Sequence, residues 1–147
     1  MDYLIIAVVV FVALSPLISM LPNGRKLKQA KMRQSALSLG MLVAFSDIPK
    51  ASKYDKTEKG ICYRLLTHDR KRAIVAGVHK FVRSSDTWVS AGPVSELQIS
   101  LLNRLPKAVS AASIEPTACS IYWQEQGQEK DVISIFEVLT ELIELKY

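Results

Sequence analysis

The chain has 147 residues, two cysteines and a formal net charge of +5. Two cysteines exclude a disulfide-stapled scaffold, and the length allows one ordinary domain, or a smaller domain with an anchor. The charge is divided unevenly, because residues 22–83 carry fifteen Lys or Arg against four acids, whereas residues 84–147 carry four against nine. This division indicates an anionic surface near the first half and an internal or external cationic partner for the second.

Residues 3–21, YLIIAVVVFVALSPLISML, form an uncharged apolar run. A helix of this length reaches about 28 Å, close to the hydrocarbon thickness of a bilayer, which is about 30 Å. The acidic start Met1-Asp2 and the lack of an A-x-A pattern after the run argue against a cleaved signal peptide. The lack of a polar stripe argues against a buried core helix. The run therefore predicts a transmembrane anchor over residues 1–22, bent near Pro16.

Five cations and no acid follow the apolar run directly: Arg25, Lys26, Lys28, Lys31 and Arg33. Cations close to a span are retained on the cytoplasmic side, so we expect the N-terminus outside and the rest of the chain inside. Residues 23–40 are predicted to form a basic juxtamembrane helix ended by Gly40, which lies along the membrane surface or continues the anchor. The five cations are therefore candidate contacts for anionic lipid headgroups, each worth about 1 kcal/mol at most.

Extended segments are predicted over residues 41–45, 61–67, 73–83 and 87–90, with an exposed loop at 46–59. The second and third segments flank a short polar stretch of hairpin length, so an antiparallel meander is expected, with a bulge or close backbone approach at Gly77. The polar stretch holds Arg70, Lys71 and Arg72, which form a second candidate phosphate contact, with a plain solvated turn as the alternative.

The C-terminal part combines helices and strands. Ser95 with Gln98 three residues later is a capping-box pattern, which opens a helix with Leu97, Leu101, Leu102 and Leu105 on one face. Strands are predicted over 108–114 and 118–125, and Asp131 caps a final helix with a buried stripe formed by Val132, Ile135, Phe136, Leu139, Leu142 and Ile143. The predicted fold class is α+β: one N-terminal transmembrane helix, then a small cytoplasmic domain at 41–147 with an antiparallel sheet of about five strands and two packed helices.

The sequence carries no convincing catalytic signature. It has no Gly-rich phosphate loop, no H-E-x-x-H and no G-x-S-x-G. Cys62 and His68 are six positions apart, which matches no standard zinc spacing, and Cys62 and Cys119 lie in apolar runs typical of inert core thiols. We therefore expect no enzymatic activity, metal or cofactor, although spacing alone neither supports nor excludes a nucleophile made of either cysteine with His79.

The stretch LPNGRKLKQAKMRQSALSLGMLV, after a short tail and one span, resembles the start of YajC-type accessory subunits of the bacterial preprotein translocase. Those proteins follow their span with a proline, a basic helix and a leucine–glycine entry into a small β domain. The resemblance covers about the first 45 residues, beyond which the glycine-rich entry of that family is absent and two further helical segments are present. The whole chain looks more like uncharacterised single-span inner-membrane proteins of Gram-negative bacteria.

Together these features predict a membrane-anchored, non-enzymatic accessory or scaffolding protein of the inner membrane, with its domain in the cytoplasm. We expect it to contact the lipid bilayer and a protein partner in or at the membrane. One alternative is peripheral binding of anionic lipid or nucleic acid through the two basic clusters. Nucleic acid is the less favoured of these ligands, because alternation in the predicted strands places several of the nearby aromatics in the core. The other alternative is the accessory role in protein translocation that the YajC-type resemblance implies.

Overall fold

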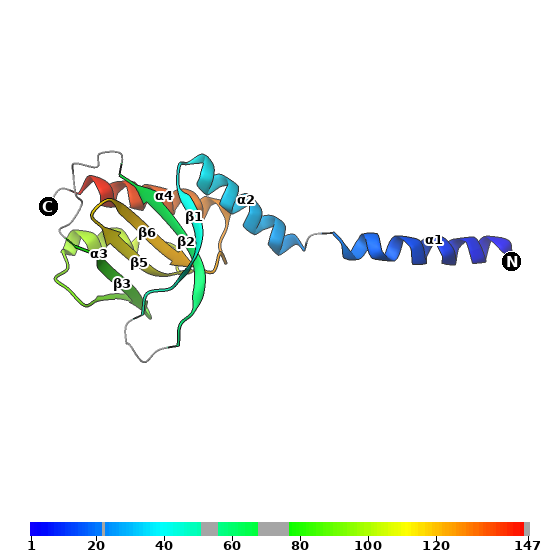
Figure 1. The fold of residues 1–147 in the computed structure, drawn as a ribbon, viewed down its shortest axis with the longest axis horizontal. Coiled ribbons are helices and arrows are strands. Elements are labelled where there is room, and N and C mark those ends of the chain that lie inside the picture. Colours follow the sequence, from blue (N-terminus) through cyan, green and yellow to red (C-terminus); the bar gives the residue numbers. More distant parts are fainter. Residues whose placement is uncertain (22, 51–55, 68–76, 146–147) are drawn as a thin grey trace.

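The computed structural model describes residues 1–21, 23–50, 56–67 and 77–145. In this part of the chain an apolar helix, α1, extends away from a folded α+β domain, and a second helix, α2, connects the two (Figure 1). In chain order the elements are α1 (Asp2–Ser19), α2 (Gly24–Ser38), β1 (Leu42–Asp47), β2 (Lys59–Leu66), β3 (His79–Ser84), β4 (Thr87–Ser90), α3 (Glu96–Asn103), β5 (Val109–Glu115), β6 (Ala118–Trp123) and α4 (Glu129–Glu144).

The strands form one antiparallel sheet in the order β1-β2-β6-β5-β3-β4. The described residues thus hold six strands, where a sheet of about five was expected, and each strand overlaps one of the six extended segments predicted from the sequence. The hairpin β5–β6 occupies the centre of the sheet, and Ile121 pairs with Tyr63 on one side and Ala112 on the other.

The predicted hairpin between residues 61–67 and 73–83 is wrong, because β2 pairs with β1 and β6, whereas β3 pairs with β4 and β5. The physical reason is burial: every residue of β6, ACSIYW, is buried, and a fully buried strand needs a neighbour on each side. The strand β3 begins at His79, so Gly77 precedes the strand and is not a bulge within it. Residues 73–76 lie outside the described part of the chain.

One face of the sheet is covered by helices. The helix α4 lies across this face between α2 and α3, and it buries Val132, Ile135, Val138, Leu139 and Leu142 (Figure 1). Most of the predicted stripe is confirmed, although Phe136 and Ile143 are only partly buried and Val138 was not predicted. The helix α2 packs as a third helix through Met32 and Ala36, which belong to the same core. The thin apolar stripe of α2 therefore faces protein over its C-terminal half.

The predicted capping box of α3 is confirmed. The backbone N–H of Ser95 donates to Oε1 of Gln98, and Oγ of Ser95 accepts from the backbone N–H of Leu97. The predicted buried face is wrong at Leu97, whose side chain is 63% exposed. The side of α3 that carries Gln98 and Leu102 faces the core. The adjacent side, with Leu97 and Leu101, therefore faces the C-terminal end of α4. An exposed leucine is thus left beside the end of α4.

The opposite face of the sheet carries a smaller cluster of Ile48, Cys62, Ala111 and Tyr122. The N–H of Ile48 donates to the carbonyl of Glu58, so the ends of the connection between β1 and β2 pair with each other. The predicted exposed loop at 46–59 is therefore shorter than expected, because its first two residues end β1 and its last begins β2. Residues 51–55 lie outside the described residues.

Candidate functional site

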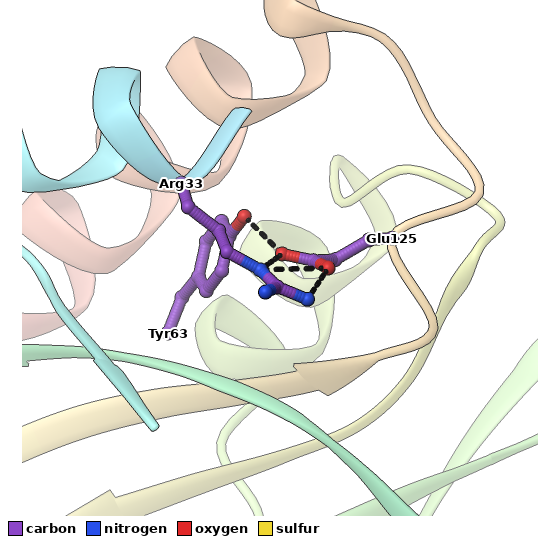
Figure 2. A network of polar contacts seen from close by, with 3 residues as sticks. All are labelled: Arg33, Tyr63 and Glu125. Carbon is purple, nitrogen blue, oxygen red and sulfur yellow. Dashed lines mark hydrogen bonds and ion pairs between the residues drawn. The ribbon is translucent and has the colours of Figure 1, made fainter. Parts of the chain in front are cut away.

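A network of three side chains joins α2 to the domain (Figure 2). Arg33 of α2 donates from Nη2 to Oε2 of Glu125 over 2.6 Å and from Nε to Oε1 over 2.9 Å. The hydroxyl of Tyr63, on β2, donates to Oε1 of the same carboxylate over 2.8 Å. The carboxylate of Glu125 has no solvent exposure, and the residue follows β6 with a backbone φ of 53°. Three separate elements therefore meet at one buried carboxylate.

The network satisfies its own charges. A buried carboxylate is stable only when it is paired and hydrogen-bonded, and Glu125 receives both a guanidinium and a phenol. Its hydrogen bond raises the pKa of Arg33, so the guanidinium stays charged. Burial and the hydrogen bond to Glu125 raise the pKa of Tyr63 above its ordinary range. Arg33 therefore stays charged and Tyr63 stays protonated, so both continue to donate hydrogen bonds to the Glu125 carboxylate. These bonds hold the C-terminal half of α2 on the domain.

The N-terminal half of α2 stands free of the domain. Residues 24–28 are exposed, and the first fully buried position of the helix is Met32. No described side chain forms an ion pair with the four exposed cations of this half: Arg25, Lys26, Lys28 and Lys31. Arg33 differs from them, because it contacts Glu125 and the ring of Phe45, 5.5 Å from its centroid. The predicted cluster therefore separates into four free cations and one docking residue.

The second predicted cluster, Arg70, Lys71 and Arg72, lies outside the residues that the structure describes. The helix α1 has no buried residue, and its length and apolar composition are sufficient for one crossing of a membrane. Within the described ranges it is the one helix with that property. The exposed cations of α2 follow it in the chain.

The two thiols are core residues. Cys119 has no exposure and Cys62 is 8% exposed. Burial raises the pKa of Cys119 to about 12 and raises the pKa of Cys62 as well, so both remain protonated near neutral pH. In the described ranges no group of three or more His, Cys, Asp or Glu side chains gathers where a metal ion could be held.

Two open cavities flank the C-terminal end of α4. The first, the α2–α4 cavity, has a volume of about 590 Å³ and lies between the end of α2, the strands β1 and β2, and Phe136 and Ile143 of α4. The second, the α3–α4 cavity, has a volume of about 340 Å³ and is lined by apolar side chains that include Leu97, Leu101 and Leu145. Glu144 lines both cavities, so they meet at the last turn of α4.

No family model, no curated protein and no solved structure matches this chain. The candidate sites therefore stand on geometry. Sequence reasoning missed Glu125 and Tyr63, since Glu125 lies in the polar stretch QEQGQE and Tyr63 in an apolar strand. Neither position has a local pattern that distinguishes it from a solvated acid or a core aromatic.

Proposed function

We propose that this chain is a single-span inner-membrane protein that binds a protein partner through its cytoplasmic domain and catalyses no reaction. The observation that carries the proposal is α1, whose apolar side chains are all exposed although the domain that follows has a well-packed core. A continuous apolar surface of this kind is stable in a bilayer and unfavourable in water. The cations that follow α1 favour the N-terminus outside and the domain in the cytoplasm.

The connection between α1 and the domain supports a role in positioning. The free half of α2, from Gly24 to Lys31, has eight residues and is about 12 Å long. Because Arg33 and Glu125 fix the other half, the free half of α2 projects from the domain as a helix. A helix that projects from the domain in this way suits an accessory or scaffolding protein that holds its domain away from the membrane.

The α2–α4 cavity supports binding in preference to chemistry. Its volume is about 590 Å³, and its lining is mostly apolar. Glu144 is the one ionisable side chain of its described lining, and the buried thiols lie elsewhere. An apolar cavity with one charge suits the side chains of a protein partner.

The test is extraction and co-purification of the full chain from bacterial membranes in a mild detergent. We expect alkaline carbonate to leave the chain in the membrane, and a stoichiometric protein partner to remain bound. A variant with Val9→Lys and Val12→Lys should lose the membrane association, because charges at the middle of a span are unfavourable. Recovery of the wild-type chain in the soluble fraction, or as a single species without any partner, would contradict the proposal. Translocase components in the complex would favour the YajC-type accessory role.

A second candidate function is contact with anionic lipid through Arg25, Lys26, Lys28 and Lys31. The observation that favours it is their exposure without an acidic partner among the described side chains. In nanodiscs, anionic lipid should protect the three lysines from acetylation, whereas zwitterionic lipid should not, because attraction to a cation requires net surface charge. Equal protection in both lipids would exclude this role. Lys80, on β3, is the internal reference for unprotected modification.

A further inference from the structure

The strand β1 forms one edge of the sheet and pairs on one side only. Its pairing with β2 runs without a break from Leu42 and Arg64 to Asp47 and Lys59. Edge strands are usually protected against further pairing by short length, by lysine or proline, or by a bulge. The strand LVAFSD has six residues, no cation, no proline and no bulge, whereas β4 at the other edge has four residues. The β1 edge is therefore the less protected of the two.

A hydrogen bond next to β1 identifies which of its main-chain groups face outward. The N–H of Ile48 donates to the carbonyl of Glu58, one step beyond the last pair of the two strands. Bonded and non-bonded pairs alternate in an antiparallel ladder, so the even-numbered residues of β1 bond to β2. The odd-numbered residues turn their N–H and C=O groups away from β2, and no described residue bonds to them: Val43, Phe45 and Asp47.

The described segments that follow β1 and β2 turn toward the middle of the sheet. Lys50 and Lys56 line one cavity together with Val82 of β3. The N–H of Thr67, just after β2, donates to the carbonyl of Thr117, in the turn between β5 and β6. Because β1 is the outermost strand, these residues lie across β2 from its free edge.

The helix α2 brings positive charge to this edge. Phe45 is 78% exposed, and the centroid of its ring lies 5.5 Å from Cζ of Arg33. Phe45 points to the helix-covered face of the sheet, because it pairs with Ile61 of the core. Figure 1 shows α2 leaving the domain beside β1, and the free half of α2 carries four exposed cations. A strand added to β1 therefore lies near positive charge on its α2 side.

This charge argues against a second copy of the chain at the edge. Pairing of β1 with β1 of another copy brings two basic α2 helices to one boundary, where like charges repel. An acidic segment of a different protein meets the same edge with charge attraction. The main-chain groups require this segment to be extended.

We propose that the free edge of β1 binds an extended segment of a partner protein that carries acidic residues. The segment adds to the sheet as a further strand and bonds to the main chain of Val43, Phe45 and Asp47. Its side chains alternate between the two faces, so its acids lie on the side of α2. This inference rests on the proposed function and specifies the chemistry of the partner.

The test uses the alternation of main-chain groups along β1. Proline at position 45 removes an outward N–H and leaves the bonds to β2 in place. Phe45→Ala is the matched control, because it removes the same ring and keeps the N–H. When the full chain is purified in a mild detergent, Phe45→Ala should retain the partner and Phe45→Pro should retain at least tenfold less. Thermal unfolding of both variants verifies the fold, and equal retention or equal loss in the two would overturn strand addition.

Photo-crosslinking identifies what lies at the edge, with p-benzoylphenylalanine in place of Phe45. The control position is Val89, which is 49% exposed on the other edge strand. In intact membranes position 45 should form an adduct to an acidic segment of the co-purified protein, and position 89 at least tenfold less. Lys31→Glu should reduce the adduct at least threefold, whereas Lys80→Glu on β3 should leave it unchanged. An adduct to lipid, to a second copy, or to a neutral or basic segment would overturn the inference, as would the absence of an adduct.

Amide hydrogen exchange tests the same edge without a substitution. The amides of Val43, Phe45 and Asp47 should exchange at least tenfold more slowly in the complex than in the purified chain, and equal rates would contradict the inference. Co-purification separates this failure from failure of the proposed function. A partner retained equally by the wild type and by Phe45→Pro leaves the accessory role standing and removes the edge as its site. Loss of any partner from the wild type removes both.

Discussion

Arg33 and Glu125, 92 positions apart in the sequence, form a bidentate ion pair in which the carboxylate has no solvent exposure. The side chain of Arg33 remains 35% exposed, so the pair lies at the boundary between α2 and the core. Removing one partner of such a pair leaves the other charge buried and uncompensated, which is more unfavourable than the absence of both. The stability of the domain should therefore depend on a residue of the helix that connects it to α1.

Arg33→Ala should destabilise the folded chain by about 2 kcal/mol. This value lies below the range of about 3–5 kcal/mol for broken buried pairs, because a third of the arginine is in solvent and screened. The measurement is urea unfolding of the full chain in detergent, followed by tryptophan fluorescence. Lys31→Ala is the matched control, since Lys31 lies on the same helix without an ion pair to any described side chain. It should change the free energy of unfolding by less than about 0.5 kcal/mol. Equal effects of the two substitutions would show that the ion pair does not hold α2.

The contribution of Tyr63 should disappear at alkaline pH. Burial, together with the hydrogen bond to Glu125, raises its pKa in the folded chain, whereas the unfolded chain ionises near its ordinary value of about 10. The contribution is therefore fully present below pH about 10 and falls as the pH rises above that value. Tyr63→Phe should lose less stability than the wild type between pH 9 and 11. The lysines titrate in both proteins, so their effect cancels in the difference between the unfolding free energies of the wild type and Tyr63→Phe. If that difference does not change with pH, the raised pKa of Tyr63 is contradicted.

Native thiols should be unreactive. Since burial raises the pKa of both Cys62 and Cys119, a disulfide reagent such as Ellman's reagent at pH 8 should modify fewer than one thiol per chain. The same reagent in denaturant should modify two. A fast native reaction would reveal an accessible thiolate and would revive a nucleophile built on His79.

Two glycines should respond in opposite directions to alanine. A Cβ at Gly127 would lie 2.5 Å from Oδ2 of Asp131 and 2.8 Å from the ring of Trp123, so Gly127→Ala should destabilise by about 1–3 kcal/mol. A Cβ at Gly24 meets nothing within 4 Å at the first position of α2, so Gly24→Ala should stabilise by about 0.4–1 kcal/mol. Thermal unfolding followed by circular dichroism measures both, and a common direction would contradict this difference in packing.

Local sequence patterns predicted the local elements. The capping box at Ser95 and Gln98 and the helix end at Gly40, with a φ of 85°, are each specified by a few neighbouring residues. The stripe of α4 follows from its period, and Leu139 and Leu142 are buried as predicted. These features depend on residues within one or two turns, which a single sequence displays directly.

Pairing between distant segments could not be predicted in the same way. The sequence runs that form β2 and β3 were both predicted to be strands. They do not pair with each other, because the fully buried strand β6 and its partner β5 lie between them in the sheet. The same holds for Arg33, which sequence analysis grouped with four other cations because nothing local indicates that Glu125 is its partner. Burial of α2 at Met32 also depends on α4, more than ninety positions later.

The central position of β5 and β6 determines when the sheet can close. Until residues 118–123 have left the ribosome, β2 has a single neighbour and offers an unpaired edge, and β3 is in the same state until β5 is made. Pairing across such sequence separations folds slowly, and open edges recruit other strands. If α1 anchors the chain as proposed, these open edges wait close to the membrane surface, where the strands of neighbouring nascent copies are the nearest partners for incorrect pairing.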